Sequence, residues 1–306
     1  MPQAVRFDGY GGTEVLEVRE VDRPEAAPGR VVVRVRAASI NPGEIGIREG
    51  DYHERWPATF PSGEGSDLAG VVEEVGDGVQ GLAPGDEVYG WTDERGSHAE
   101  LVSVPAEQLL PKPEALSWEV AGSLYVAGLA GLASVRHVAP AAGEVVVVSA
   151  AAGGVGVFTV ALARETGATV IGLAGEHNHD WLREHGVVPV AHGDGVEDRI
   201  REASGGRVDA FIDLYGGGYV DLALRLGVAK ERINTIIDFA AAAEHGVAVE
   251  GTSQIASPEA LREVADLVVA GRIDVPIAAT YPLARVRDAY AELAERRTRG
   301  KIVLLP

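Results

Sequence analysis

Residues 144–176 read EVVVVSAAAGGVGVFTVALARETGATVIGLAGE, a run of glycines between two apolar runs, and this stretch decides the fold. The run Val145–Val148 is typical of a buried strand, and Thr169–Leu173 predict a second one. Between them we expect a helix from about Val155 to Gly167. A strand, a helix and a strand within about thirty residues predict one βαβ unit.

The spacing of the small residues at the bend predicts a phosphate cradle. It reads Ala150-x-x-Gly153-x-x-Gly156, or Ala151-x-Gly153-x-x-Gly156 against the familiar glycine pattern. Gly153 lets the backbone approach a pyrophosphate, Gly156 lets helix and strand pack closely, and the helix N-terminus offers free N–H groups. We favour a dinucleotide site over a merely tight turn, with Ala150, Gly153, Gly154, Val155 and Gly156 as its contacts.

The segment after the second strand bears on which dinucleotide is bound. Ala174 and Gly175 are small and uncharged, which favours NADP, whereas Glu176, about 20 residues beyond Gly156, favours NAD. His177 and Arg183 can face a 2'-phosphate or can be solvated helix residues. The local sequence leaves both coenzymes open.

The pattern of residues along the rest of the chain changes near Ser117. Before it lie short β-runs broken by Gly and Pro, and in one of them Val33, Val35 and Ala37 alternate with charged residues. Residues 117–139 predict one long apolar helical stretch with Ser117 as its N-cap, and strands then alternate with helices up to the strand-like INTIIDFAA and GVAVEGT. The sequence predicts an α/β protein with a β-rich domain and a doubly wound parallel sheet.

Two further strand ends are candidate cofactor contacts, because ligands bind at the carboxyl ends of parallel strands. They are Leu214 and Tyr215 after FID, and Ile237, Asp238 and Phe239 after INTI. Tyr215 and Phe239 can instead be core aromatics.

Composition excludes several classes of protein. The net charge of -19 argues against a nucleic-acid partner. The chain has no apolar stretch of about 18 residues to span a membrane, and its first residues do not resemble a signal peptide, so we expect a cytoplasmic protein. The absence of cysteine excludes disulfides, thiol nucleophiles and thiolate metal sites.

With these segments in view, the chain resembles a zinc-independent medium-chain dehydrogenase/reductase of the quinone oxidoreductase (zeta-crystallin-like) group. The matching stretches follow one another in the family's order: AASINPGEIGIREGDY, PSGEGSDLAGVVEEVGDGVQGLAPGDEVYG, GSHAELVSVPAEQLLPKPEALSWEVAGSL, SAAAGGVG, VDAFIDLYGG and RGKIVLLP.

The resemblance implies a discontinuous architecture. A GroES-like catalytic domain would comprise residues 1–125 and 257–306, and a Rossmann cofactor domain residues 126–256, with the nicotinamide in the cleft between them. It also implies NADPH as the usual reductant, with NADH as the alternative, and a homodimer formed through the cofactor domains with GVAVEGT as the edge strand.

The residues agree with the resemblance on zinc. Ser66 and Asp67 stand where zinc-dependent relatives carry a His-Glu pair, and cysteine ligands are absent. His53, His98, Asp67 and Glu100 are the residues from which another metal site would have to be built, but dispersed histidines are more often structural. We expect no metal.

Without a metal, the acceptor has to delocalise the charge that hydride transfer creates, as a quinone or an α,β-unsaturated carbonyl does. Asn41 carries over from the family's pattern as a group that bonds the nicotinamide ribose or the acceptor oxygen, or else only forms a turn before Pro42. Tyr52 carries over as a proton donor to the reduced acceptor, or else as an aromatic residue that only packs.

The chain departs from the family in places that bear on function. Ala130 stands where a threonine is typical near the nicotinamide, and Gly193 stands where a tyrosine is frequent near the 2'-phosphate. We predict an NADPH-dependent reductase of quinones or enones. The alternatives are an enoyl-thioester reductase of a biosynthetic pathway and an NADPH-binding protein without turnover.

Overall fold

The computed structural model describes residues 1–306, and contacts within the chain divide them into two compact units. The first unit comprises Met1–Val126, Ser257–Val269 and Pro276–Pro306, and the second comprises Ala127–Ala256 and Ala270–Val275. The segment 270–275, expected in the first domain, groups with the second because Arg272 contacts Glu165 and Asp274 contacts Trp181 and His185.

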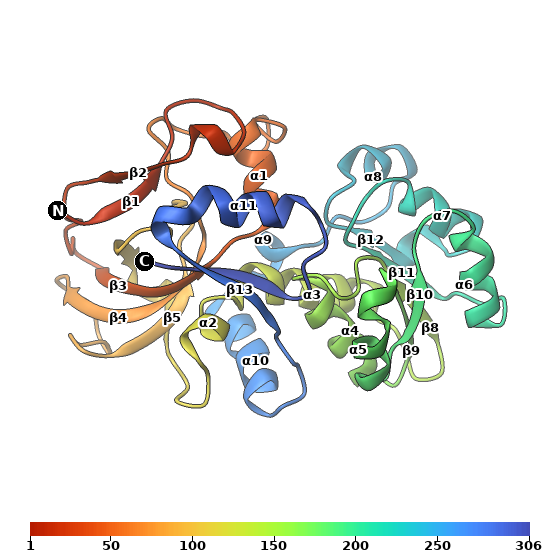
Figure 1. Cartoon of the computed structure of the whole chain (residues 1–306). Helices are drawn as coiled ribbons and strands as arrows, with labels where there is room; N and C mark the ends of the chain where they lie inside the picture. Colours follow the sequence, from red (N-terminus) through yellow and green to blue (C-terminus); the bar gives the residue numbers. More distant parts are fainter. The chain divides into compact units, whose positions relative to one another are not determined.

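The first unit is built on a seven-stranded sheet that includes β3, β4 and β5 (Figure 1), and β6 joins it as a third partner of β3. The remaining order is β13-β14-β3-β4-β5-β7, with only the β13–β14 pair parallel. The strands are β3 (Arg30–Ser39), β4 (Asp67–Val75), β5 (Glu87–Trp91), β6 (Leu101–Pro105), β7 (Leu109–Pro111), β13 (Ile277–Pro282) and β14 (Lys301–Leu305). The predicted alternation in β3 is confirmed, because Val33, Val35 and Ala37 are buried and Arg34 and Arg36 exposed.

Shorter elements cover this sheet. They are the pair β1 (Gln3–Arg6) and β2 (Glu17–Glu20), and the helices α1 (Pro42–Glu49), α2 (Trp118–Ala121), α10 (Pro258–Val269) and α11 (Val286–Ala294). The α11 helix packs on β13 and β14 and buries Tyr290 against Phe7, Ile302 and Leu304. Because β14 pairs antiparallel with β3, the end of the chain lies beside residues 38–39.

The stretch predicted as one long helix forms two. The α2 helix is followed by a break and by α3 (Tyr125–Val138), which leads into the second unit. The carbonyl oxygen of Gly122 accepts a hydrogen bond from the N–H of Ser39, the last residue of β3, at 2.9 Å. In a continuous helix this oxygen would accept from a backbone N–H of the following turn instead. The Ser117 cap is confirmed, since its Oγ accepts from the Val120 N–H at 3.3 Å.

The second unit holds a five-stranded, fully parallel sheet in the order β10-β9-β8-β11-β12 (Figure 1). The strands are β8 (Val145–Val148), β9 (Thr169–Ala174), β10 (Val188–Ala191), β11 (Ala210–Asp213) and β12 (Ile233–Thr235). The helices are α4 (Gly156–Glu165), α5 (His179–Glu184), α6 (Val196–Ser204), α7 (Tyr219–Arg225), α8 (Phe239–His245) and α9 (Thr252–Ile255). The predicted α/β class is confirmed.

Two predicted strands in this unit were wrong in extent. INTIIDFAA forms a strand only over β12, because the Thr235 Oγ1 accepts from the N–H groups of Ile237 and Asp238 and turns the chain. GVAVEGT is no strand beyond one bridge between Ala248 and Asn234. The Asn234 side chain bonds both backbone groups of Glu250, at 2.7 and 2.9 Å, and so replaces the ladder that would continue the strand.

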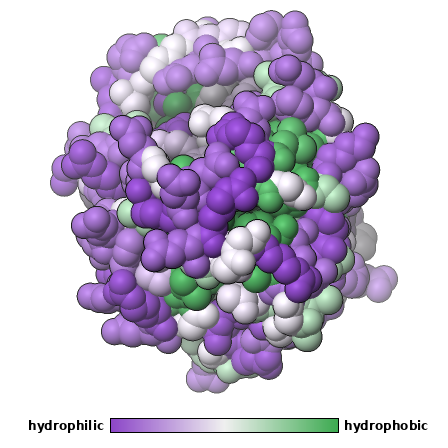
Figure 2. All heavy atoms as spheres, turned by 90° about the vertical axis from the view of Figure 1, so that its right-hand side faces the viewer, coloured by the Kyte–Doolittle hydropathy of each residue, from purple (hydrophilic) through white to green (hydrophobic).

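Figure 2 shows a face on which hydrophilic side chains predominate and hydrophobic ones gather near the middle. No helix in the chain is both long and apolar enough to cross a bilayer.

Candidate active site

In the second unit the chain proceeds from β8 through β9 to β10 toward one edge of the sheet, and from β11 to β12 toward the other edge. The direction of strand order therefore changes between β8 and β11. In doubly wound sheets the crevice for ligands opens at such a point, beyond the carboxyl ends of the strands. The glycine bend follows β8, so it lies at this place.

The bend is tightly built on one side and open on the other. Ala150 has a φ of +46°, and a Cβ on Gly156 would collide with the carbonyl oxygens of Ala150 and Ala151. A Cβ on Gly153 would meet only Ala150, whose carbonyl oxygen would lie 3.2 Å away. Gly156 therefore fits the predicted packing role, and Gly153 has fewer and more distant neighbours than Gly156.

Several N–H groups of the bend lack a backbone partner. Ala151 donates to Leu173 and Gly153 to Ala150, at 3.0 and 2.9 Å. The N–H groups without a backbone acceptor are those of Ala152, Gly154, Val155 and Gly156. They lie at the positive end of α4, so the bend fits an anionic group such as a diphosphate.

A buried carboxylate ties the strand ends beneath the bend. Asp213, fully buried at the end of β11, accepts from Ser149 Oγ at 2.8 Å, from Thr235 Oγ1 at 2.9 Å and from the N–H groups of Tyr215 and Gly216. Ser149 Oγ in turn accepts from the Leu214 N–H at 2.7 Å. Sequence analysis missed this residue, because its partners Ser149 and Thr235 lie at the ends of other strands.

The other predicted contacts in the second unit lie at the same edge of the sheet. Leu214 and Tyr215 follow β11, and Tyr215 is 42% exposed with its ring edge-on to Tyr219, so it is no core aromatic. Ile237 follows β12, Asp238 caps α8 by accepting from the Ala241 N–H at 3.1 Å, and the half-buried Phe239 begins that helix.

After β9, Gly175 leads into a short 3-10 turn over Glu176–Asn178. The His177 ring lies over Gly175, where a Cβ would come within 2.8 Å of the ring, and its Nε2 lies 3.0 Å from Asn178 Nδ2. Glu176 is exposed, and Arg183 donates to Asp180 at 2.6 Å. The positive charge of Arg183 is therefore already balanced.

In the first unit, Asn41 precedes α1 and belongs to a buried polar cluster. Its Nδ2 donates to Asp67 Oδ2 at 2.8 Å and to Glu44 Oε1 at 3.2 Å. Its Oδ1 accepts from Lys301 Nζ at 2.6 Å, and Tyr290 donates to Glu44 Oε2 at 2.7 Å. Sequence analysis found Asn41 but not the partners Glu44, Lys301 and Tyr290, which sit on three different elements.

Burial shifts the pKa of several groups in and beside this cluster. It raises the pKa of Glu64 to about 8, with the charge of Glu44 adding to the effect and Arg48, 2.7 Å away, opposing it. Burial likewise lowers the pKa of Lys301 and of His98, whose Nε2 lies 3.2 Å from the Ser39 carbonyl.

Tyr52 follows α1 and is half-buried. Its ring packs where a Cβ on Gly46 would stand and meets Trp56 edge-on, with ring centroids 5.8 Å apart. Burial and the charge of Asp51 raise the pKa of Tyr52, so its hydroxyl keeps its proton at neutral pH.

Other features bear on alternatives raised by the sequence. No group of three or more His, Cys, Asp or Glu side chains in the chain is arranged to hold a metal ion, His53, His98, Asp67 and Glu100 included. Ala130 is buried in α3, and Gly193 lies exposed after β10.

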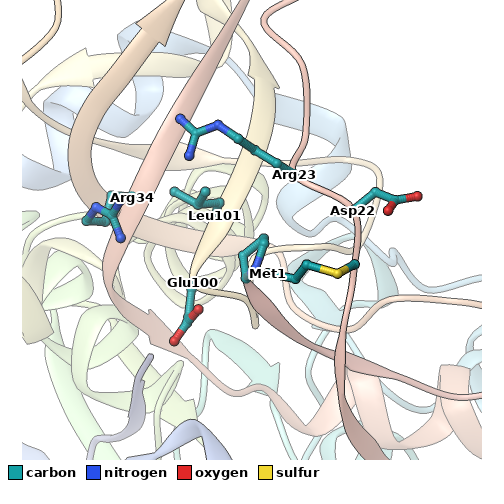
Figure 3. Close-up of a pocket in the computed structure, with 7 residues that line it drawn as sticks. Met1, Asp22, Arg23, Arg34, Glu100 and Leu101 are labelled. Carbon is teal, nitrogen blue, oxygen red and sulfur yellow. The ribbon is translucent and has the colours of Figure 1, made fainter.

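The first unit also has a surface pocket of about 440 Å³, which is distinct from the sites described above (Figure 3). It is lined by Met1, Pro2, Asp22, Arg23, Arg34, Glu100 and Leu101, and contains no predicted site residue. Both of its arginines form ion pairs with Glu73, and Arg23 also lies 4.0 Å from Glu74.

Comparison with known proteins agrees with this architecture. Residues 27–114 match the alcohol dehydrogenase GroES-like domain, and residues 185–304 match the family described as zinc-binding dehydrogenase. A quinone oxidoreductase of Pseudomonas aeruginosa is 32% identical over the full length of both chains.

Two further proteins are similar to this chain. The structure of Escherichia coli quinone oxidoreductase complexed with NADPH is 25% identical, covers 99% of this chain and 100% of its own, and superposes with a TM-score of 0.87. A mycocerosic acid synthase-like polyketide synthase of Mycobacterium tuberculosis is 30% identical across 96% of this chain, which spans 15% of that protein. The chain therefore belongs to the quinone oxidoreductase group of the medium-chain dehydrogenases/reductases, and it is an oxidoreductase.

Proposed function

We propose that this protein is an NADPH-dependent, zinc-free reductase that transfers hydride to a quinone or an α,β-unsaturated carbonyl compound. The observation that carries the proposal is the open cradle of N–H groups at the bend after β8. NADPH, when bound, supplies the hydride, and the chemistry of the transfer belongs to it.

The chain's own residues would hold the cofactor along the carboxyl edge of the parallel sheet. Residues 152–156 would bind the diphosphate, with the space beside Gly153 admitting it. Gly175 and His177 would lie at the adenosine ribose, and the ends of β11 and β12 would flank the nicotinamide half. Asp213, at the end of β11, stabilises the relative positions of the strand ends by bonding to Ser149 after β8 and to Thr235 of β12.

The first unit would contribute the groups that act on the acceptor. Asn41 would bind a polar group of the cofactor or acceptor, and Tyr52, which keeps its proton at neutral pH, would donate it to the reduced oxygen. Because an enolate or quinol anion delocalises its charge, this arrangement needs no metal ion.

Preference for NADPH over NADH rests on the uncharged Ala174 and Gly175 and on the NADPH-bound relative from E. coli. The exposed Glu176 opposes it. We also propose a cytoplasmic homodimer acting on a small molecule. Size-exclusion chromatography with light scattering tests the dimer, for which GVAVEGT no longer offers an edge strand.

A second candidate is favoured by the similarity to a polyketide synthase, namely reduction of an enoyl thioester. Mixing the protein with NADPH and, in turn, benzoquinones, 2-enals and enoyl thioesters, while following loss of reduced nicotinamide absorbance, separates the two. We expect turnover with quinones or enals. Turnover with thioesters alone supports the second candidate, and tight binding without turnover supports a binding protein.

A further inference from the structure

The Asn41 amide, which the proposed function places at the reacting groups, is surrounded by partners of fixed hydrogen-bonding character. A carboxamide has two N–H donors and one oxygen with two acceptor sites. Both donors are engaged by Asp67 and Glu44, and one acceptor site is engaged by the Lys301 ammonium. The second lone pair of Oδ1 has no side-chain partner in the cluster, so it is the one site of this amide that a ligand could use.

The partners also determine which way round the amide stands. Lys301 offers only donors, so it has to face the amide oxygen. Asp67 and Glu44, when ionised, offer only acceptors, so they have to face the nitrogen. Rotating the amide by half a turn would set N–H against ammonium and oxygen against two carboxylates, within a cluster whose members are less than 8% exposed.

We propose that Lys301 is a positioning residue that locks the Asn41 amide, so that Asn41 serves the reaction only as a hydrogen-bond acceptor. The inference rests on the proposed function and narrows it. Asn41 can accept from a hydroxyl, such as one on the nicotinamide ribose, but it has no N–H left to hold the negative oxygen of the reduced acceptor. That oxygen has to be served by another donor, with Tyr52 as the candidate in the first unit.

The lock depends on the last strand of the chain. Lys301 begins β14, is 3% exposed and lies 260 residues from Asn41 in sequence. Its Nζ also lies 3.4 Å from the Ile40 carbonyl oxygen, so one ammonium group holds both the backbone before α1 and the side chain at its start. β14 pairs with β3, which brings this lysine to its place.

The test compares Lys301→Met with Tyr290→Phe, a matched variant that removes a buried donor from the same cluster without a direct bond to Asn41. For each we would measure thermal stability, exchange of the Asn41 Nδ2 protons by NMR, and NADPH affinity by calorimetry. Lys301→Met should speed that exchange about 10-fold and weaken NADPH binding by about 10-fold, the worth of one buried hydrogen bond. Tyr290→Phe should change both by less than about 3-fold at a comparable loss of stability.

Lys301→Arg, which keeps a donor, should restore part of both properties, and it replaces the methionine variant if that one does not fold. Asn41 exchange in Lys301→Met that equals the wild-type rate, or equal weakening of NADPH binding by Tyr290→Phe, would overturn the proposal. If the wild-type protein bound no NADPH, the proposed function would fail, whereas the Asn41 exchange rates would still decide whether Lys301 locks the amide.

Discussion

The glycine bend of the second unit and the polar cluster of the first unit are built in opposite ways. The bend is local, since residues 149–156 carry its backbone conformation and its open N–H groups. The cluster draws Asn41, Asp67, Tyr290 and Lys301 from four separate segments and has few open groups. The comparison teaches that local sequence determines the bend, whereas residues distant in sequence determine the orientation of the side chains in the cluster.

The largest expected effect comes from filling the closed side of the bend. Gly156→Val places side-chain atoms where the carbonyl oxygens of Ala150 and Ala151 lie, so the turn has to move. We expect NADPH affinity to fall about 100-fold or more and the free energy of unfolding to fall by about 2–3 kcal/mol. Calorimetry and thermal unfolding measure both, and wild-type affinity in this variant would refute the described turn.

The next effect concerns Asp213, the buried link between strand ends. Asp213→Asn turns an amide nitrogen toward Ser149, Thr235 or the N–H groups after β11, all of which donate to the native carboxylate. The expected cost is about 2–3 kcal/mol of unfolding free energy, because a buried donor is left without an acceptor. Chemical denaturation provides the measurement, and Asp209→Asn in the same unit is a control for the loss of charge.

The third expected effect is a pH dependence of stability that Glu64 gives to the first unit. The folded-state pKa of Glu64, about 8, lies above its ordinary value of 4.5, so its stabilising contribution is present below 4.5 and is lost as pH rises through 8. Glu64→Gln should remove this pH-dependent contribution. The free energy of unfolding of the variant relative to the wild type should therefore rise with pH over that range, by up to about 1.4 kcal/mol per pH unit. Thermal unfolding of both proteins from pH 5 to 8 checks it, and parallel curves would contradict the raised pKa.

The smallest effect is expected at Arg183. Its guanidinium is exposed and paired with Asp180, so Arg183→Ala should change stability by less than about 1 kcal/mol and NADPH affinity by less than about 3-fold. Titration of the variant with NADPH decides the matter. A loss above tenfold would mean that Arg183 leaves Asp180 to bind the 2'-phosphate.

The same contrast explains how much of the molecule the sequence could predict. The α/β class and the bend followed from periodicity and spacing, since both are local properties. Asp213 and Lys301 could not be placed, because their partners come from other strands and, for Lys301, from 260 residues away.

Two of the mispredicted elements, the long helix and the strand GVAVEGT, were altered by contacts outside their own segments. A helix broke where Ser39 takes the Gly122 carbonyl, and a strand ended where the Asn234 side chain takes the backbone of Glu250. Propensity and periodicity contain no information about such distant partners.

The central claim is that the open N–H groups after β8 bind the diphosphate of NADPH, and calorimetric titration of the wild type and Gly153→Ala tests it most directly. Gly153 has no left-handed φ, so alanine is compatible with the backbone conformation, and its methyl group would lie 3.2 Å from the Ala150 carbonyl oxygen, next to the open N–H groups. The account predicts measurable NADPH binding in the wild type, about 10-fold weaker binding in the variant and a nearly unchanged Tm. Equal affinity in the two proteins, or no binding in either, would contradict it.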